Sequence, residues 1–273
     1  MDNAKRAALA DMAKRIRLGA LEGVFNAGSG HPGGSLSIAD LLSYLYTEEM
    51  KIDPKNPTWE DRDRFVLSKG HTAPAYYAVL AEMGYFPRES IKTLRKVDSI
   101  LQGHPDMKHI PGVDMTTGSL GLGISAACGM ALAGKIAGKD YRVYTIVGDG
   151  ESEEGQVWEA AMFASHYKLT NLCVILDWNG LQIDGPVTEV MNPTPHDKKF
   201  EAFGFNVISI DGHDFEAIES AFRAARECTD RPTAIIAKTV KGKGVSFMEN
   251  KVGWHGKAPN KEEYEQAVAE LNA

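Results

Sequence analysis

The sequence has few cysteines and no apolar run long enough to cross a membrane. Its three cysteines, Cys128, Cys173 and Cys228, lie far apart and form no C-x-x-C pair, which argues against a zinc knuckle or a redox-active pair. We expect them to be buried, reduced thiols, as is usual in the cytosol. A membrane-spanning helix needs roughly 20 apolar residues, and the N-terminus lacks the apolar core of a signal peptide. These absences predict a cytoplasmic protein without membrane contacts.

An excess of positive charge is also missing. The 273 residues include 30 Lys and Arg against 37 Asp and Glu, which gives a net charge of −7. This balance argues against a nucleic acid or an anionic membrane held by bulk electrostatics, but it leaves room for a local basic pocket around one phosphorylated ligand. With 43% apolar and 25% charged residues, the composition is that of an ordinary globular protein.

The second half of the chain alternates apolar strands with helical patterns. The clearest strands are residues 141–147, 172–176 and 233–239. Because these runs are almost continuously apolar, they should be buried on both faces, as in parallel sheets covered by helices. An amphipathic helix at 4–25 and a short strand at 65–68 precede them. No repeat or linker divides the chain, so we predict one α/β domain over residues 1–273, with a mainly parallel sheet flanked by helices.

Polar, glycine-containing loops follow several predicted strands. They are Lys69-Gly70-His71, Gly148-Asp149-Gly150 and Asp177-Trp178-Asn179-Gly180. Glycines permit tight turns and Asp or Asn caps helices, so a purely structural explanation stays open for any single loop. Ligands of parallel sheets nevertheless bind beyond the carboxyl ends of the strands. Several such loops at equivalent strand ends therefore favour a common binding site.

Asp149 and Asn179 lie 30 residues apart, the length of one strand–helix–strand unit. Carboxylate and amide oxygens, with no sulfur or imidazole in these loops, suit Mg²⁺ or Ca²⁺. A diphosphate would fit between this metal and the backbone N–H groups of Gly148 and Gly150. The dinucleotide pattern G-x-G-x-x-G is absent from the first strand turns, and the P-loop pattern G-x-x-x-x-G-K-[ST] is absent altogether.

Four of the eight histidines lie in loops flanked by glycine or proline: His31, His71, His104 and His255. A lone loop histidine is usually an exposed or locally bonded side chain. Histidine can nevertheless donate, accept and carry a proton near neutral pH, so this group favours a polar pocket for a hydroxylated substrate. Lys241, which directly follows the last predicted strand, is the best-placed lysine to contact an anionic ligand.

Gly148-Asp149-Gly150 followed by Asn179 resembles the thiamine diphosphate (ThDP) signature, and the surrounding segments resemble transketolases. In the family's order they are Ser29-Gly30-His31-Pro32-Gly33, Lys69-Gly70-His71, Gly103-His104-Pro105, Thr117-Gly118-Ser119-Leu120-Gly121, Asn179-Gly180-Leu181-Gln182-Ile183-Asp184-Gly185 and Trp254-His255-Gly256. The match covers essentially the whole chain and implies the diphosphate-binding domain of the ThDP-binding fold. Lys69 and Trp178 depart from the pattern, which leaves the cofactor assignment intact but blurs the donor specificity.

The resemblance assigns roles to individual residues. It implies that Mg²⁺, with Ca²⁺ or Mn²⁺ as substitutes, is bound by Asp149, the Asn179 side chain and the Leu181 carbonyl. It implies cofactor contacts from His71, Gly118, Leu120, Gly148, Asp149, Gly150, Glu154, Asn179, Ile183, Lys241 and His255. It implies that His31, His104 and His255 hydrogen-bond the donor sugar during catalysis. Glu154 and Glu159 match acids that couple cofactor sites across a subunit interface, although acids are also favoured at any helix N-terminus.

The activity implied is reversible transfer of a two-carbon ketol unit from a ketose phosphate to an aldose phosphate, as in the pentose phosphate pathway, with ThDP performing the carbanion chemistry. Family members are more than twice as long, and their second domain holds the cofactor's pyrimidine. The chain is similar to the N-terminal subunit of a split transketolase. We therefore expect it to require a C-terminal, pyrimidine-binding partner subunit, as a heterotetramer.

Two alternatives stay open from the sequence. One is the equivalent subunit of another ThDP enzyme, either a 1-deoxyxylulose-phosphate synthase or a 2-oxo-acid decarboxylase. The other is a non-catalytic subunit of the same fold that scaffolds a partner. The sequence leaves open the sugar pair, the stoichiometry and whether ThDP binds without the partner.

Overall fold

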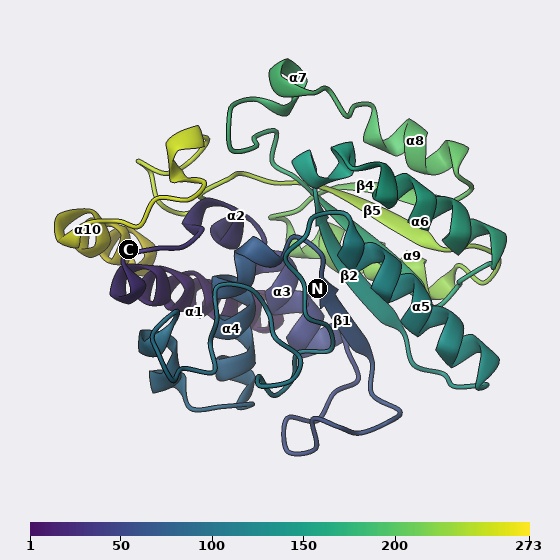
Figure 1. Ribbon diagram of the computed structural model, residues 1–273, viewed down its shortest axis with the longest axis horizontal. Coiled ribbons are helices and arrows are strands. Elements are labelled where there is room, and N and C mark those ends of the chain that lie inside the picture. The colour runs from purple at the N-terminus through teal and green to yellow at the C-terminus, as the bar shows by residue number, and fades with distance from the viewer.

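A five-stranded parallel sheet forms the centre of the computed structural model, which describes residues 1–273 (Figure 1). The strands are β1 (Arg64–Leu67), β2 (Val143–Gly148), β3 (Leu172–Trp178), β4 (Asn206–Asp211) and β5 (Thr233–Lys238). Their order is β1-β2-β3-β5-β4, and every neighbouring pair is parallel. The predicted α/β class with a parallel sheet is confirmed.

Helices cover both faces of the sheet (Figure 1). Successive side chains of a strand point to opposite faces, so each strand contributes to two separate cores. In β3, Cys173 and Ile175 pack in the larger core, whereas Val174 and Leu176 pack in the smaller one. The helices of the larger core are α1 (Asn3–Ala27), α3 (Ala39–Tyr44), α4 (Ala73–Met83) and α9 (Phe215–Glu227). Those of the smaller core are α5 (Leu122–Ile136), α6 (Gly155–His166) and α8 (His196–Ala202).

The long first helix matches its prediction closely. The Asp2 side chain caps α1 by accepting a 2.8 Å hydrogen bond from the Lys5 backbone N–H, and Gly28 ends the helix at φ 61°. Gly19 lets α1 approach α4, because a Cβ at this position would lie 2.8 Å from the Cβ of Ala78. This close contact joins the N-terminal helix to the larger core.

The short helices were not all predicted. The glycine-rich stretch that we expected to be a loop contains α2 (Pro32–Ser37), which begins with proline at its first position and is buried throughout. Helices α7 (Val187–Val190), α8 and α10 (Lys261–Asn272) were also missed. After α4, the chain forms a 3₁₀ turn at Arg88–Thr93.

The cysteines follow the prediction with one exception. Cys128 and Cys173 are buried, Cys228 is only half-buried, and all three are free thiols. The Cys228 prediction was wrong because this residue lies just past the end of α9, where the chain approaches the surface. No helix combines the length and apolar character that crossing a membrane would require.

Candidate active site

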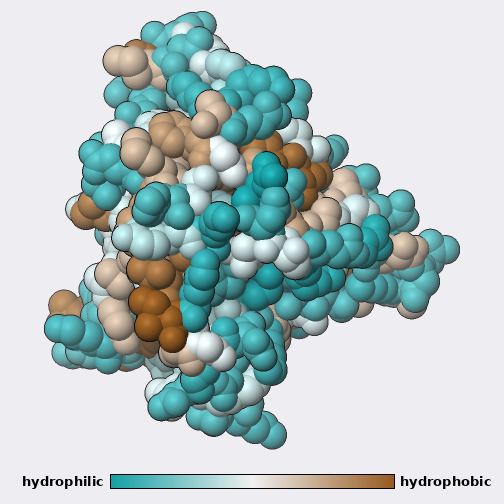
Figure 2. All heavy atoms as spheres, turned by 90° about the vertical axis from the view of Figure 1, so that its right-hand side faces the viewer, coloured by the Kyte–Doolittle hydropathy of each residue, from teal (hydrophilic) through white to brown (hydrophobic).

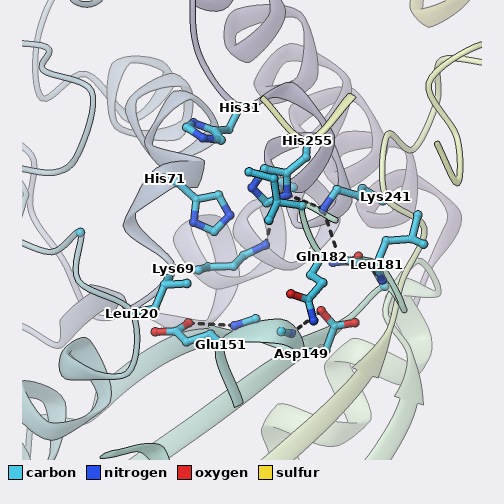
Figure 3. Close-up of a pocket in the computed structure, with 16 residues that line it drawn as sticks. His31, Lys69, His71, Leu120, Asp149, Glu151, Leu181, Gln182, Lys241 and His255 are labelled. Carbon is cyan, nitrogen blue, oxygen red and sulfur yellow. Dashed lines mark hydrogen bonds between the residues drawn. The ribbon is translucent and has the colours of Figure 1, made fainter. Parts of the chain in front are cut away.

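A cavity of about 300 Å³ lies beyond the carboxyl ends of β1, β2 and β3 (Figure 3). It collects loops that are distant in sequence, as expected for the ligand-binding edge of a parallel sheet. All the predicted site residues except His104, Glu154 and Glu159 line it. These are His31, His71, Gly118, Leu120, Gly148, Asp149, Gly150, Asn179, Leu181, Ile183, Lys241 and His255.

Asp149 provides the carboxylate of the cavity. It directly follows β2, is 2% exposed, and accepts hydrogen bonds from the N–H groups of Gly150 (2.9 Å) and Gly180 (2.5 Å). Burial, and then the negative charge of Asp177, raise the pKa of Asp149 to about 7. No cationic side chain lies within 4.0 Å of this carboxylate, so a buried negative charge here favours an added cation.

Two further oxygens face the same cavity from the loop after β3. The Asn179 side chain donates through Nδ2 to Asp177 (3.0 Å), and its Oδ1 accepts from the Leu181 N–H (3.1 Å). The Leu181 carbonyl accepts from Lys241 Nζ at 3.1 Å. An isolated bridge between Leu181 and Pro186 closes the loop. Carboxylate, amide and carbonyl oxygens form a donor set that fits Mg²⁺ or Ca²⁺.

This donor set is not a cluster of acidic side chains. No three His, Cys, Asp or Glu residues are grouped in a way that would hold a metal ion. A cation would therefore depend on the amide and carbonyl oxygens, and on oxygens supplied by a bound anion or by water. Mg²⁺ commonly completes its coordination shell with waters and phosphate oxygens.

Three histidines form a cluster on the opposite wall (Figure 3). The ring centroids of His31, His71 and His255 lie 5.2–5.4 Å apart. Burial is the main cause that lowers the pKa of His31 to about 4, that of His255 to about 3 and that of His71 well below its usual value. All three rings are thus neutral at pH 7 and offer hydrogen bonds without charge. Nδ1 of His31 is buried without a partner.

Lys241 links the histidines to the proposed metal ligands. It is 2% exposed, and Nζ lies 3.0 Å from Nδ1 of His255 as well as 3.1 Å from the Leu181 carbonyl. Because Nδ1 of the neutral His255 ring accepts this bond, Nε2 carries the proton and is a donor. Burial, followed by the charge of Lys69, lowers the pKa of Lys241 to about 8. Its ammonium group supplies positive charge for an anionic ligand.

The backbone N–H groups of Gly148 and Gly150 have partners within the chain. They donate to the carboxylates of Glu151 and Asp149, each at 2.9 Å, and their expected contact with a diphosphate stays a prediction. Glu151 is 2% exposed and also accepts from Ser68 Oγ. Both glycines line the cavity.

Some residues that line the cavity were not predicted from the sequence. They are Gly34, Lys69, Glu151 and Gln182. Each lies in or directly after a motif that had been singled out, so proximity to those motifs was the available signal. What could not be read from the sequence was the contact of Lys69 Nζ with Asp177 at 2.5 Å, across 108 residues.

His104 and Glu154 lie outside the cavity lining. His104 lines a neighbouring hollow, where its ring would lie 3.4 Å from a Cβ placed on Gly118. Glu154 is exposed at the start of α6. Glu159, also exposed, lines a shallow hollow between α5 and α6 with Gly129. The roles expected of these side chains remain predictions.

Comparison with known proteins agrees with the geometry. Residues 9–272 match the family described as the transketolase thiamine diphosphate binding domain. A 6-deoxy-6-sulfo-D-fructose transketolase subunit from Clostridium sp. (strain MSTE9) is 49% identical, with 96% of each chain covered. One of the subunits of the apulose-4-phosphate transketolase from Phocaeicola vulgatus is 43% identical, over 92% of this chain and 89% of that protein.

Longer proteins match over part of their length. The human transketolase is 45% identical over 99% of this chain, which spans only 43% of the human protein. The crystal structure of the Campylobacter jejuni transketolase superposes with a TM-score of 0.92 at 37% identity, over 97% of this chain and 43% of that one. The chain thus spans less than half the length of these relatives.

Proposed function

The chain belongs to the transketolase family, as a match to its thiamine diphosphate-binding domain, and from this premise we propose that it is the diphosphate-binding subunit of a two-chain transketolase. The observation that carries the proposal is one cavity that combines a metal-type oxygen set with a buried lysine and neutral histidines. Its reaction would be reversible transfer of a two-carbon ketol unit between sugar phosphates.

The metal and cofactor positions follow from the cavity. Asp149, the Asn179 side chain and the Leu181 carbonyl would hold Mg²⁺, or Ca²⁺ or Mn²⁺ in its place. The proposal is supported by the buried carboxylate without a cationic partner and by the oxygen-only donor set. Lys241 would balance the diphosphate charge. When bound, ThDP supplies the carbanion chemistry that breaks and forms the bond next to the ketose carbonyl.

The remaining residues would orient the cofactor and the sugar. Neutral His255 donates from Nε2, and the neutral ring of His31 lines the same cavity, so both suit hydroxyl or carbonyl groups of a donor ketose. His71 would lie beside the diphosphate, and His104 would be near the terminal hydroxyl. The proposed cofactor neighbours are otherwise Gly118, Leu120, Gly148, Gly150, Glu154 and Ile183.

A partner subunit is the second part of the proposal. The two relatives that this chain covers almost completely are both named as subunits. Leu120 and Ile183 line the cavity yet are 38% and 59% exposed, which leaves apolar surface at its mouth. A C-terminal transketolase subunit that holds the pyrimidine would cover this surface. We place the assembly in the cytoplasm, without nucleic acid or membrane.

An apolar surface over α5 and α6 supports assembly into a heterotetramer. Figure 2 looks onto this side of the molecule and shows hydrophobic patches among the hydrophilic surface. Its exposed apolar residues include Leu122, Ile136, Met162, Phe163 and Tyr167. Exposed apolar residues grouped in this way are typical of interaction surfaces. Two copies of this chain would meet here, each with its own pyrimidine-binding partner.

The class of donor sugar is the third part of the proposal. The relatives are named for 6-deoxy-6-sulfo-D-fructose and for apulose-4-phosphate, so an anionic ketose is the class we propose, with pentose phosphates among the candidates. The neutral histidine cluster favours a polyhydroxylated donor over pyruvate. A 1-deoxyxylulose-phosphate synthase, a 2-oxo-acid decarboxylase and a non-catalytic scaffold are the alternatives that an assay has to separate from this proposal.

The test is an assay of the chain with a transketolase-like C-terminal subunit from the same genome. We expect ketose-dependent transfer to an aldose phosphate in the presence of Mg²⁺ and ThDP, and little CO₂ release from pyruvate. Pyruvate-dependent CO₂ release without ketol transfer would support the decarboxylase alternative. Full-rate transfer by the chain alone would contradict the partner requirement.

A further inference from the structure

A fully buried carboxylate lies beneath the proposed metal site. Asp177, near the end of β3, is 0% exposed and is not part of the cavity lining. It accepts hydrogen bonds from Ser37 Oγ (2.8 Å), Lys69 Nζ (2.5 Å), Asn179 Nδ2 (3.0 Å) and the Thr239 hydroxyl. Both of its oxygens therefore already have donors, so the side chain acts as an anchor and not as a metal ligand.

The donors come from separate parts of the chain. Ser37 ends α2, Lys69 follows β1, and Thr239 follows β5. A carboxylate held from these directions has little rotational freedom, because any rotation would break bonds to buried donors. Asp177 thus has a fixed orientation, and it can orient the side chain of Asn179, which is its fourth donor.

The Asn179 amide is held on both sides. Its NH₂ group donates to Asp177, and its oxygen accepts the Leu181 N–H at 3.1 Å. A reversed amide would set an oxygen against the carboxylate and an NH₂ group against an N–H donor, so the network allows one orientation only. An amide oxygen has two acceptor sites, and this orientation leaves the second one for a ligand in the cavity that Asn179 lines.

The main chain of Asp177 also holds Asp149, which is the other side chain proposed as a metal ligand. Asp149 N–H donates to the Asp177 carbonyl at 3.2 Å, and Gly148 pairs with Asp177 in the parallel register of β2 and β3. We propose that Asp177 is a positioning residue that presents the Asn179 oxygen, together with Asp149, to a divalent cation. This inference rests on the proposed function, because it assumes that the cavity binds a metal with its diphosphate.

The test is a double-mutant cycle on Mg²⁺ affinity, measured by calorimetry in the presence of saturating ThDP and the partner subunit. Asp177→Asn should weaken Mg²⁺ binding by about 10- to 100-fold, the usual cost of losing a group that orients a metal ligand. In an Asn179→Ala background the same change should alter the affinity by no more than a factor of about two, because Asp177 acts through Asn179.

Two further variants separate positioning from folding. Lys69→Met/Asp177→Asn removes the ion pair without leaving a buried, unpaired lysine, and urea unfolding in EDTA shows whether each variant is folded. This double variant should show the same loss of Mg²⁺ affinity. Ser43→Ala is the matched control, because it removes one buried hydroxyl hydrogen bond, to the Leu9 carbonyl, without touching Asp177 or Asn179, and it should bind Mg²⁺ as the wild type does.

The outcomes distinguish this role from the proposed function. A folded Asp177→Asn variant with wild-type Mg²⁺ affinity would overturn the positioning role alone. An equal loss in the Asn179→Ala background would also overturn it, since Asp177 would then act by another route. If the wild-type chain bound no Mg²⁺ with ThDP, the proposed function would fail first, and the positioning role with it.

Discussion

Lys241 and Leu181 are joined by a hydrogen bond in which the buried ammonium group donates to a carbonyl oxygen at 3.1 Å. The same carbonyl is a proposed metal ligand, so Lys241 and a bound cation share one acceptor. Like charges at such short range repel each other, whereas a bound diphosphate attracts both. The lysine should thus oppose the free cation and favour the metal–diphosphate pair.

Replacing this lysine should separate the two effects. Lys241→Met should weaken Mg²⁺-dependent ThDP binding by at least about tenfold, the equivalent of roughly 1.4 kcal/mol for a charged hydrogen-bonding group. Mg²⁺ alone should bind no more weakly than to the wild type. Calorimetry measures both affinities. Lys243→Met is the control, because Lys243 is more exposed and lies 3.6 Å from Glu249. Equal ThDP affinity in all three proteins would contradict the role of Lys241.

The buried His196 predicts a dependence of stability on pH. Burial, and then the charge of Lys199, lower the pKa of His196 to about 4. An unfolded histidine titrates near pH 6.5, so between these values the unfolded chain binds the extra proton. The contribution of neutral His196 to the free energy of unfolding is therefore fully present above about pH 6.5, and it is lost as the pH drops towards 4.

A substitution at His196 should make this dependence shallower. His196→Gln removes one titrating group, so the free energy of unfolding should fall less between pH 7.5 and pH 5 than in the wild type. Urea unfolding at several pH values measures it, with His166→Gln, at an exposed position, as the control. If His196→Gln and the wild type lost stability in parallel, the neutral buried state assigned to His196 would be incorrect.

Two glycines of α5 should respond in opposite ways to alanine. A Cβ on Gly123 would lie 2.5 Å from the Cα of Ser68, whereas one on Gly129 would have no neighbour within 4 Å. Gly123→Ala should lower the free energy of unfolding by about 1–3 kcal/mol through overpacking. Gly129→Ala should raise it by about 0.5–1 kcal/mol, since alanine is the better helix former. Denaturant unfolding of the chain alone provides both values, and similar values would contradict the close approach at Ser68.

The exposed face of α6 should control assembly. Met162 is 60% exposed on the proposed interface between copies of this chain, so Met162→Glu would place a charge in a desolvated contact. The mass of the assembled protein, measured by light scattering, should fall. Val97→Glu, at a position that is 91% exposed elsewhere on the surface, should leave the mass unchanged. An unchanged mass for Met162→Glu would place the interface on another face.

The sequence predicted the sheet and most of the cavity because both depend on local patterns. The apolar runs of β2 and β3 end directly at Asp149 and near Asn179, so the strand ends and the ligand candidates were found together. Helix α2 was missed because Gly33 and Gly34 are poor helix formers, and it is stabilised by burial on all sides. Tertiary packing overrides local preference there.

Of the other features that were not predicted, one had a signal in the sequence and the rest had none. Helix α10 carries a recognisable capping box between Asn260 and Glu263, so its start was available in the sequence. The hydrogen bond from the Gly148 N–H to Glu151 could not be predicted from the sequence. It depends on the burial of the Glu151 carboxylate at the cavity, which only the fold reveals. The Asp177 contacts likewise join segments 62 to 140 residues apart, which no local pattern reveals.

If this chain holds the metal–diphosphate end of ThDP, its binding of ThDP depends on a divalent cation. Calorimetric titration of ThDP into the wild-type protein, with Mg²⁺ and with EDTA, tests it most directly. The titration is carried out on the chain alone and with its partner subunit. We predict saturable, Mg²⁺-dependent binding that is lost in EDTA and in an Asp149→Ala variant. Absence of binding both with and without the partner, or binding that is the same without Mg²⁺ and in the Asp149→Ala variant, would show that this cavity is not the diphosphate site.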